Sequence, residues 1–82
     1  MTEAEILECL LLAAKRSFSR DVTAQDNFFA LGGDSLIAMM FVDEVGHELG
    51  TEFDFEHVFE AEDFADLAHR ITAARASDLE SQ

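Results

Sequence analysis

The chain is 82 residues long, which leaves room for one small domain, and 49% of its residues are apolar, which argues against intrinsic disorder. Its 18 acidic and 5 basic side chains give a formal net charge of −13, so nucleic acid is a poor partner, because affinity for phosphates comes largely from Lys and Arg. No apolar run approaches the roughly 20 residues that span a bilayer, and the first residues are acidic where a signal peptide is basic, so we expect a cytoplasmic protein without membrane contact.

The first predicted helix begins after Thr2 and reaches Phe18. The hydroxyl of Thr2 can accept a hydrogen bond from the first turn while Glu5 reaches back, which is the capping-box arrangement. Apolar residues then recur at three- and four-residue steps and predict a core-facing stripe of Leu7, Leu10, Leu11, Ala14 and Phe18. Cys9 falls within this apolar pattern, and we interpret it as a buried structural thiol.

A loop follows over residues 19–33, which is long for so small a domain. We expect it to be held against the core by three apolar residues, Phe28, Phe29 and Leu31. Asp34 then caps a second helix, which runs to about Leu49 and stops at Gly50.

A short third helix is predicted over residues 55–60, with Asp54 as its cap. Asp63 caps a fourth helix, whose buried stripe consists of Phe64, Leu67, Ala68 and Ile71. Proline is absent and strand-like alternation is scarce, so the pattern predicts an all-α fold. We expect a four-helix bundle, with three longer helices, a short third helix and a long loop between the first and second. It forms a single domain over residues 1–82, with an ordered core over about 3–76 and a frayed acidic tail over 77–82.

The second helix carries apolar residues on two opposite faces. One face suffices for the core and consists of Ala38, Phe41, Val42, Val45 and Leu49. The opposite face groups three apolar residues with two polar ones: Leu36, Met39, Met40, Asp43 and His47. A contiguous apolar set rimmed by acids is typical of a docking surface, and methionine suits surfaces that accept several partners. The alternative is that the preceding loop or the third helix covers these residues.

Ser35 follows two glycines and an aspartate where the second helix begins. Gly32 and Gly33 permit a sharp turn and leave open space beside the hydroxyl. A helix N-terminus favours a phosphate, because free N–H groups and the positive end of the helix dipole lie there, although Asp34 offsets part of this benefit. On residue type alone, Ser35 is either an attachment point or only a helix cap.

Residues 26–36 read Asp-Asn-Phe-Phe-Ala-Leu-Gly-Gly-Asp-Ser-Leu. This run resembles the motif DNFFxLGGDSL of thiolation domains, the peptidyl or aryl carrier proteins of nonribosomal peptide synthesis within the acyl carrier protein superfamily. The resemblance extends over about residues 3–75 and includes the later segments 58–61 and 64–68. Members of that family often have proline near positions 54 and 62, where this chain has Asp54 and Glu62.

The resemblance implies a covalent cofactor. A phosphopantetheinyl transferase would use coenzyme A and Mg²⁺ to attach 4′-phosphopantetheine to Ser35, beside Gly33 and Asp34, and the arm's thiol would carry an acyl group as a thioester. The chain would then be a carrier and not an enzyme, with no catalytic residue and no metal site. Met1 and the short tail favour a free-standing carrier over a fragment of a synthetase. Oligomeric state is open from the sequence, with a monomer as the simpler expectation.

The resemblance also implies partner enzymes. An adenylation enzyme would load the arm, and condensation, tailoring or thioesterase enzymes would receive the cargo. We expect the recognition face to consist of Leu36, Met39, Met40 and Asp43, with His57 and Glu60 as secondary contacts. The acidic rim would steer basic enzyme surfaces toward it.

Other functions compete with this interpretation. Fatty-acid and polyketide carriers often read Gly-Ala-Asp-Ser-Leu, whereas Gly33 and Ile37 here favour an aminoacyl or aryl cargo; a D-alanyl carrier and a plain helical interaction module also stay open. Residues 33–36 spell the GDSL of a hydrolase family, and Asp66 and His69 match its Asp-x-x-His. A chain this short, without parallel strands, cannot build that scaffold and its oxyanion hole. No histidine shows a close zinc-ligand spacing with Cys9.

Overall fold

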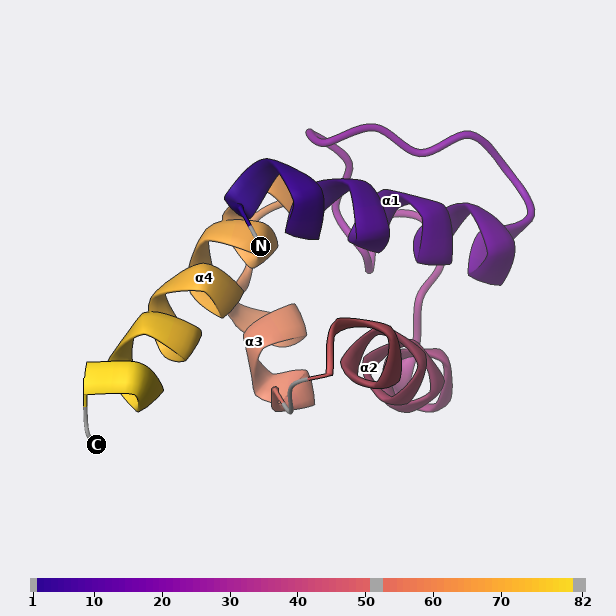
Figure 1. Cartoon of the computed structure of the whole chain (residues 1–82). Helices are drawn as coiled ribbons and strands as arrows, with labels where there is room; N and C mark the ends of the chain where they lie inside the picture. The colour runs from indigo at the N-terminus through magenta and orange to yellow at the C-terminus, as the bar shows by residue number, and fades with distance from the viewer. Residues whose placement is uncertain (1, 51–52, 81–82) are drawn as a thin grey trace.

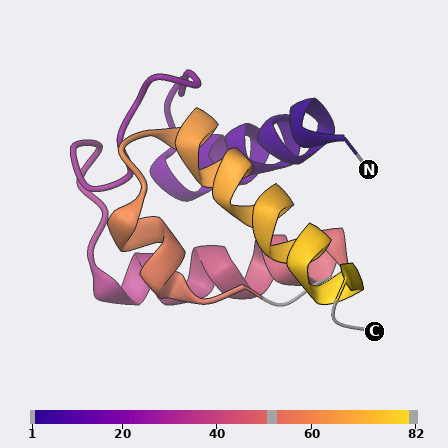
Figure 2. The same cartoon turned by 90° about the vertical axis from the view of Figure 1, so that its left-hand side faces the viewer.

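The computed structural model describes residues 2–50 and 53–80 and shows four helices and no strand within them (Figure 1). The helices are α1 (Glu3–Phe18), α2 (Ser35–Leu49), α3 (Phe55–Glu60) and α4 (Phe64–Glu80). α1 packs against both α2 and α4, and the short α3 lies between α2 and α4 (Figures 1 and 2). The predicted all-α bundle with a short third helix and a long first loop is therefore confirmed. None of the helices in these ranges is long and apolar enough to cross a bilayer.

Local sequence signals set the start of α1. The hydroxyl of Thr2 accepts from the backbone N–H of Glu5, and the Glu5 carboxylate accepts from the backbone N–H of Thr2, so the predicted capping box is present. The predicted stripe is only partly right. The fully buried residues of α1 are Ile6, Leu10, Ala13 and Ala14, whereas Leu7, Leu11 and Phe18 are half-buried at its margin. The stripe is rotated because α1 must face two helices, α2 and α4, at once.

The loop over residues 19–33 is anchored mainly by two buried side chains, Val22 and Phe28. Phe28 lies at the centre of an aromatic cluster, with ring centroids 5.1 Å from Phe18, 5.2 Å from Phe41 and 6.5 Å from Phe64. Phe29 and Leu31 pack against the core but stay half-buried. The loop is therefore held by the same core that joins α1, α2 and α4.

The later helices begin where the sequence predicts. Asp63 caps α4, because its Oδ1 accepts from the backbone N–H of Asp66 at 2.7 Å, and the predicted α4 stripe is fully buried. Asp54 occupies the N-cap position of α3, but its side chain makes no capping hydrogen bond, so this cap prediction is wrong in its chemistry. α4 continues to Glu80, beyond the point where we expected fraying; residues 81–82 of the expected tail lie outside the described chain.

Candidate functional site

A tight turn leads into α2. Three backbone hydrogen bonds close it: the N–H of Leu31 donates to the carbonyl of Asn27 at 3.2 Å, that of Gly32 to Phe29 at 3.1 Å, and that of Gly33 to Phe28 at 3.2 Å. Gly32 has φ +101°, a left-handed conformation that side chains other than glycine rarely adopt. The turn therefore reverses the chain within a few residues and delivers it to the first residue of α2.

The two glycines of this turn serve different needs. A Cβ added at Gly32 would meet nothing within 4 Å, so only the backbone angle calls for glycine there. A Cβ added at Gly33 would lie 2.8 Å from the carbonyl oxygen of Phe28 and against the ring of that buried residue. Gly33 thus allows the turn to sit directly on the aromatic cluster.

Asp34 and Ser35 form the start of α2. The Oδ1 of Asp34 accepts from the backbone N–H of Ile37 at 2.9 Å, as predicted for an N-cap, and its carbonyl accepts from the N–H of Ala38 at 2.9 Å. Ser35 is the first helical residue and is exposed. A short cap thus holds an accessible hydroxyl at the positive end of a 15-residue helix, whose first turn contains no acidic residue.

This arrangement fits a phosphodiester on the serine. The hydroxyl is open to solvent, the neighbouring Gly32 has free space around it, and the helix N-terminus favours a phosphate. Asp34 is exposed and uses one carboxylate oxygen in the cap, so its negative charge opposes part of that benefit. The site residues named from the sequence, Gly33, Asp34 and Ser35, therefore lie together at one helix start.

The outward face of α2 is uncovered among the described residues. Leu36, Met39 and Met40 are 66%, 60% and 65% exposed, and Asp43 and His47 are exposed as well. Covering by the preceding loop or by α3, the alternative left open from the sequence, does not occur. The core face is as predicted for Ala38, Phe41, Val45 and Leu49, whereas Val42 is half-buried.

A pair of exposed aromatic side chains on α3 was not predicted from the sequence. Phe55 and Phe59 on α3 are 41% and 44% exposed, with ring centroids 5.1 Å apart. The ring of Phe59 also stacks on Phe29, at 4.7 Å and an interplanar angle of 11°. The four-residue spacing of Phe55 and Phe59 could have indicated this pair, because residues four apart share one face of a helix.

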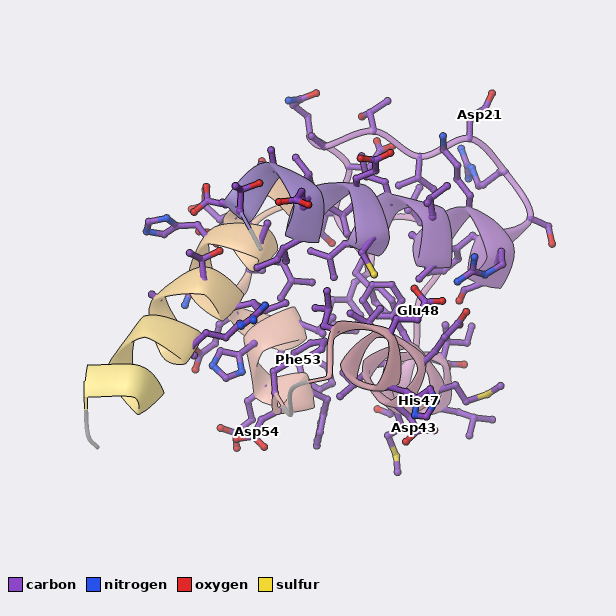
Figure 3. All side chains as sticks on the ribbon, viewed as in Figure 1. Asp21, Asp43, His47, Glu48, Phe53 and Asp54 are labelled. Atoms are coloured by element: carbon purple, nitrogen blue, oxygen red, sulfur yellow. The ribbon has the colours of Figure 1, made fainter. Side chains whose placement is uncertain are left out.

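The expected secondary contacts on α3 have local partners. The ring Nδ1 of His57 lies 3.2 Å from the carbonyl oxygen of Asp54, and the Glu60 carboxylate accepts from Arg70 at 3.3 Å. Asp43 and His47 instead line an open depression between the end of α2 and the start of the α3 segment (Figure 3). Its other lining residues are Val42, Gly46, Gly50, Phe53 and Asp54.

Asp66 and His69, the two residues that match the Asp-x-x-His of the hydrolase family, bind other residues. Asp66 accepts from the backbone N–H of Glu62 and from Arg70 Nε, both at 3.0 Å, and these bonds hold the pKa of its carboxyl below the usual range. His69 pairs with Glu3 at 3.2 Å. Asp66 is thus engaged with the α3–α4 connection and with α4, and His69 with α1. Among residues 2–50 and 53–80, no three His, Cys, Asp or Glu side chains are grouped as metal ligands.

Cys9 is half-buried, which corrects the prediction of a buried thiol. Its Sγ donates to Glu48 Oε2 at 3.1 Å, across the α1–α2 interface (Figure 3 shows Glu48 on the side of α2 that faces α1). Desolvation by burial and the hydrogen bond to Glu48 raise the pKa of the thiol to about 11. The thiol is therefore held in its protonated, unreactive form.

Two proteins with sequence similarity to this chain are fungal synthetases. The bassianolide nonribosomal cyclodepsipeptide synthetase of Beauveria bassiana is 36% identical over 77 residues, which is 94% of this chain and 2% of that protein. The malpinin synthetase of Mortierella alpina is 38% identical over 60 residues, which is 73% of this chain and 1% of that protein. The chain thus spans only a small part of the length of these relatives.

A solved structure shares the fold. BlmI, a type-II acyl-carrier-protein from Streptomyces verticillus involved in bleomycin biosynthesis, superposes with a TM-score of 0.81 over 88% of each chain, at 20% identity. The protein family described as "Phosphopantetheine attachment site" matches residues 5–71, a range that includes the whole turn and α2. The chain therefore belongs to the phosphopantetheine attachment family, a carrier-protein family whose cofactor is covalently attached 4′-phosphopantetheine.

Proposed function

We propose that Ser35 carries the 4′-phosphopantetheine arm and that the chain tethers an aminoacyl, aryl or peptidyl group for nonribosomal peptide synthesis or related natural-product enzymes. The observation that carries this proposal is the exposed hydroxyl of Ser35 at the first residue of α2, directly after the Gly-Gly turn and inside the family match. When attached, the arm supplies a thiol that holds the cargo as a thioester. The chain itself catalyses no step in this proposal.

The protein's own residues present the serine. Gly32 and Gly33 let the turn lie against Phe28, and neither residue adds a side chain next to Ser35. The Asp34 cap fixes where α2 begins and therefore where the hydroxyl lies. Tethering a substrate here replaces free diffusion by a high local concentration, and partner recognition then selects the enzyme.

The exposed face of α2 is the recognition surface in this proposal. It consists of Leu36, Met39, Met40 and Asp43, all exposed and within eight residues of Ser35 on the same helix. We infer that its partners present a shallow apolar surface with a basic rim, because the chain carries a net charge of −13. These partners are a phosphopantetheinyl transferase, an adenylation enzyme, and condensation, tailoring or thioesterase enzymes. His57 and Glu60 on α3 are secondary contacts.

Intact mass spectrometry tests the attachment site. The protein is incubated with coenzyme A, Mg²⁺ and a broad-specificity phosphopantetheinyl transferase, beside Ser35→Ala and a carrier of known activity. The proposal expects the mass of one phosphopantetheine group to be gained by the wild type and not by Ser35→Ala. No gain in folded wild-type protein, with the known carrier modified, would refute the assignment and leave Ser35 as a helix residue. Gain in Ser35→Ala would move the site elsewhere.

A further inference from the structure

Asn27 joins two segments that are distant in the chain. Its side-chain Oδ1 accepts from the backbone N–H groups of Phe29 at 2.9 Å and Ala30 at 3.0 Å. Its Nδ2 donates to the carbonyl oxygen of Glu62 at 2.9 Å and, more weakly, to that of Ala61 at 3.5 Å. Two donors at one end and two acceptors at the other fix the orientation of the amide. One side chain thus closes the turn before Ser35 and ties it to the α3–α4 connection.

Neighbouring backbone contacts join the same loop to the start of α4. The backbone N–H of Phe64 donates to the carbonyl of Asp26 at 3.2 Å, and that of Ala65 donates to Ala24 at 3.0 Å. Figure 2 shows the loop before α2 running beside the connection between α3 and α4. Asn27 is distinct among these contacts because its side chain also organises the turn itself.

The path from Asn27 to Ser35 is short. The carbonyl of Asn27 accepts from Leu31, and the carbonyl of the next residue, Phe28, accepts from Gly33. Gly33 directly precedes the Asp34 cap. A displacement of Asn27 would therefore be transmitted to the first turn of α2 through these backbone hydrogen bonds.

We propose that Asn27 is a positioning residue for the attachment reaction. Its amide holds the Gly32–Gly33 turn and the start of α2 in the conformation that presents the Ser35 hydroxyl to the transferase. This inference rests on the proposed function, because it concerns the modification of Ser35. It adds a residue whose effect comes through the backbone and not through contact with the cofactor.

Two substitutions separate the two ends of the amide. Asn27→Asp keeps an oxygen for the Phe29 and Ala30 amides but loses the donor to the α3–α4 connection, and it sets a carboxylate oxygen against two carbonyl oxygens. Asn27→Ala loses both ends. Ile71→Val is the control, because Ile71 is fully buried on α4, so its truncation weakens the core but leaves the hydrogen bonds of the Asn27 side chain in place.

The experiment has two readouts. Hydrogen exchange of the Gly33 and Ser35 amides is measured in the unmodified proteins, and kcat and KM for phosphopantetheinylation are measured by intact mass with coenzyme A and Mg²⁺. For Asn27→Asp we expect exchange of the Gly33 amide to accelerate about tenfold. We also expect kcat to fall about tenfold, because a misplaced hydroxyl loses reactive geometry. KM should change little, because the exposed face of α2 is intact. Ile71→Val should leave both readouts close to wild type.

The outcomes are distinguishable. Wild-type protein that is not modified, beside an active control carrier, refutes the proposed function and with it the role of Asn27. If wild type is modified and Asn27→Asp and Asn27→Ala are modified with the same kcat, the positioning role alone is refuted. A fall in kcat for Ile71→Val as large as for Asn27→Asp would also refute it, because general destabilisation would then explain the loss.

Discussion

Gly33 occupies a position where space, and not the backbone angle, requires glycine. An added Cβ would press on the carbonyl oxygen and ring of Phe28, which is 4% exposed and packed among other phenylalanines. At Gly32 the opposite holds, since the space is open but φ is +101°. Replacing either of these two adjacent glycines should thus destabilise the fold, but for a different physical reason at each position, and this difference can be measured.

We expect Gly33→Ala to lower the free energy of unfolding by about 2 kcal/mol through overpacking, and Gly32→Ala by about 1–2 kcal/mol through backbone strain. A second substitution, Phe28→Leu, removes part of the ring that obstructs position 33. It should therefore recover part of the loss in Gly33→Ala and none of the loss in Gly32→Ala. Urea denaturation of the single and double variants measures both couplings. Strictly additive effects for Gly33→Ala and Phe28→Leu would contradict the packing explanation.

Cys9 offers a pH-dependent test of the α1–α2 interface. Its thiol pKa is raised to about 11 by desolvation and by the hydrogen bond to Glu48, so at pH 8 only about 0.1% is thiolate, against about 20% for an ordinary cysteine. We expect alkylation by iodoacetamide at pH 8 to be more than about tenfold slower than in the urea-unfolded protein. The rate should keep rising with pH up to about 11.

The sign for stability follows from the same pKa. An acid whose pKa is raised by folding stabilises the fold below the unfolded value of about 8.5, and this contribution is lost as pH rises from there toward 11. Glu48→Gln removes the charge beside the thiol and should speed alkylation, whereas Glu56→Gln, at an exposed position on α3, should not. Equal rates in folded and unfolded wild type would contradict the raised pKa.

At the scale of helices, α2 has one face buried in the core and one exposed face, which is the proposed recognition surface. Ala38, Phe41 and Val45 are fully buried, while Leu36, Met39 and Met40 on the other face remain open. Replacing an exposed side chain of this kind has little effect on folding, because the residue has few contacts to lose. Partner binding and stability can therefore be tested independently on this helix.

We expect Met40→Asp to reduce loading of the holo protein by a partner enzyme about tenfold in kcat/KM, because the substitution places a charge in the apolar contact. Loading is measured with an adenylation enzyme that accepts the wild-type holo protein. Leu12→Asp is the matched control, since Leu12 is 50% exposed but lies on α1. The unfolding free energy of both variants should stay within about 0.5 kcal/mol of wild type. Equal loading of Met40→Asp and wild type would remove Met40 from the recognition face.

The starts of α1, α2 and α4 were predictable because their signals are local. Thr2 with Glu5, Asp34 with Ile37 and Asp63 with Asp66 each act within three residues of one another, so each cap can be identified from a short stretch of sequence. The positive-φ glycine at the end of α2 is equally local. The attachment motif was recognisable for the same reason, since its residues are contiguous.

What the sequence did not predict depends on distant residues. The partners of the Asn27 amide include Ala61, 34 positions later, and no local pattern indicates that contact. The fully buried members of α1 include Ile6 in place of Leu7, because burial depends on how α1 crosses α2 and α4. The exposed aromatic pair on α3 was also not predictable, because the exposure of a side chain depends on which residues pack near it in the fold.

At the scale of the whole molecule, charge is the dominant feature. A net charge of −13 is confined to a body of 39 × 23 × 21 Å. Two arginines offset the repulsion locally, since Arg16 bridges Glu44 and Glu48 and Arg70 bridges Asp66 and Glu60. The side chains in these pairs are partly exposed to solvent, so each pair contributes little to stability. Repulsion among the remaining acids should therefore outweigh these ion pairs. The same net negative charge would attract basic partners at long range.

Added salt should consequently stabilise the fold. The Debye length falls from about 30 Å at 0.01 M to about 10 Å at 0.1 M, that is, from most of the molecule's length to a fraction of it. We expect the free energy of unfolding to rise by about 1 kcal/mol over this range of NaCl, which corresponds to about 5 °C in Tm. Differential scanning calorimetry at fixed pH 7 measures it.

A variant with fewer charges provides the control for this prediction. Glu8 and Asp21 are exposed acids, and replacing both by their amides changes the net charge from −13 to −11. This variant should be more stable than wild type at 0.01 M NaCl and should respond less to added salt, because it has less repulsion to screen. If stability instead fell with salt, and fell equally in both proteins, the ion pairs of Arg16 and Arg70 would be the dominant electrostatic contribution and not the net charge.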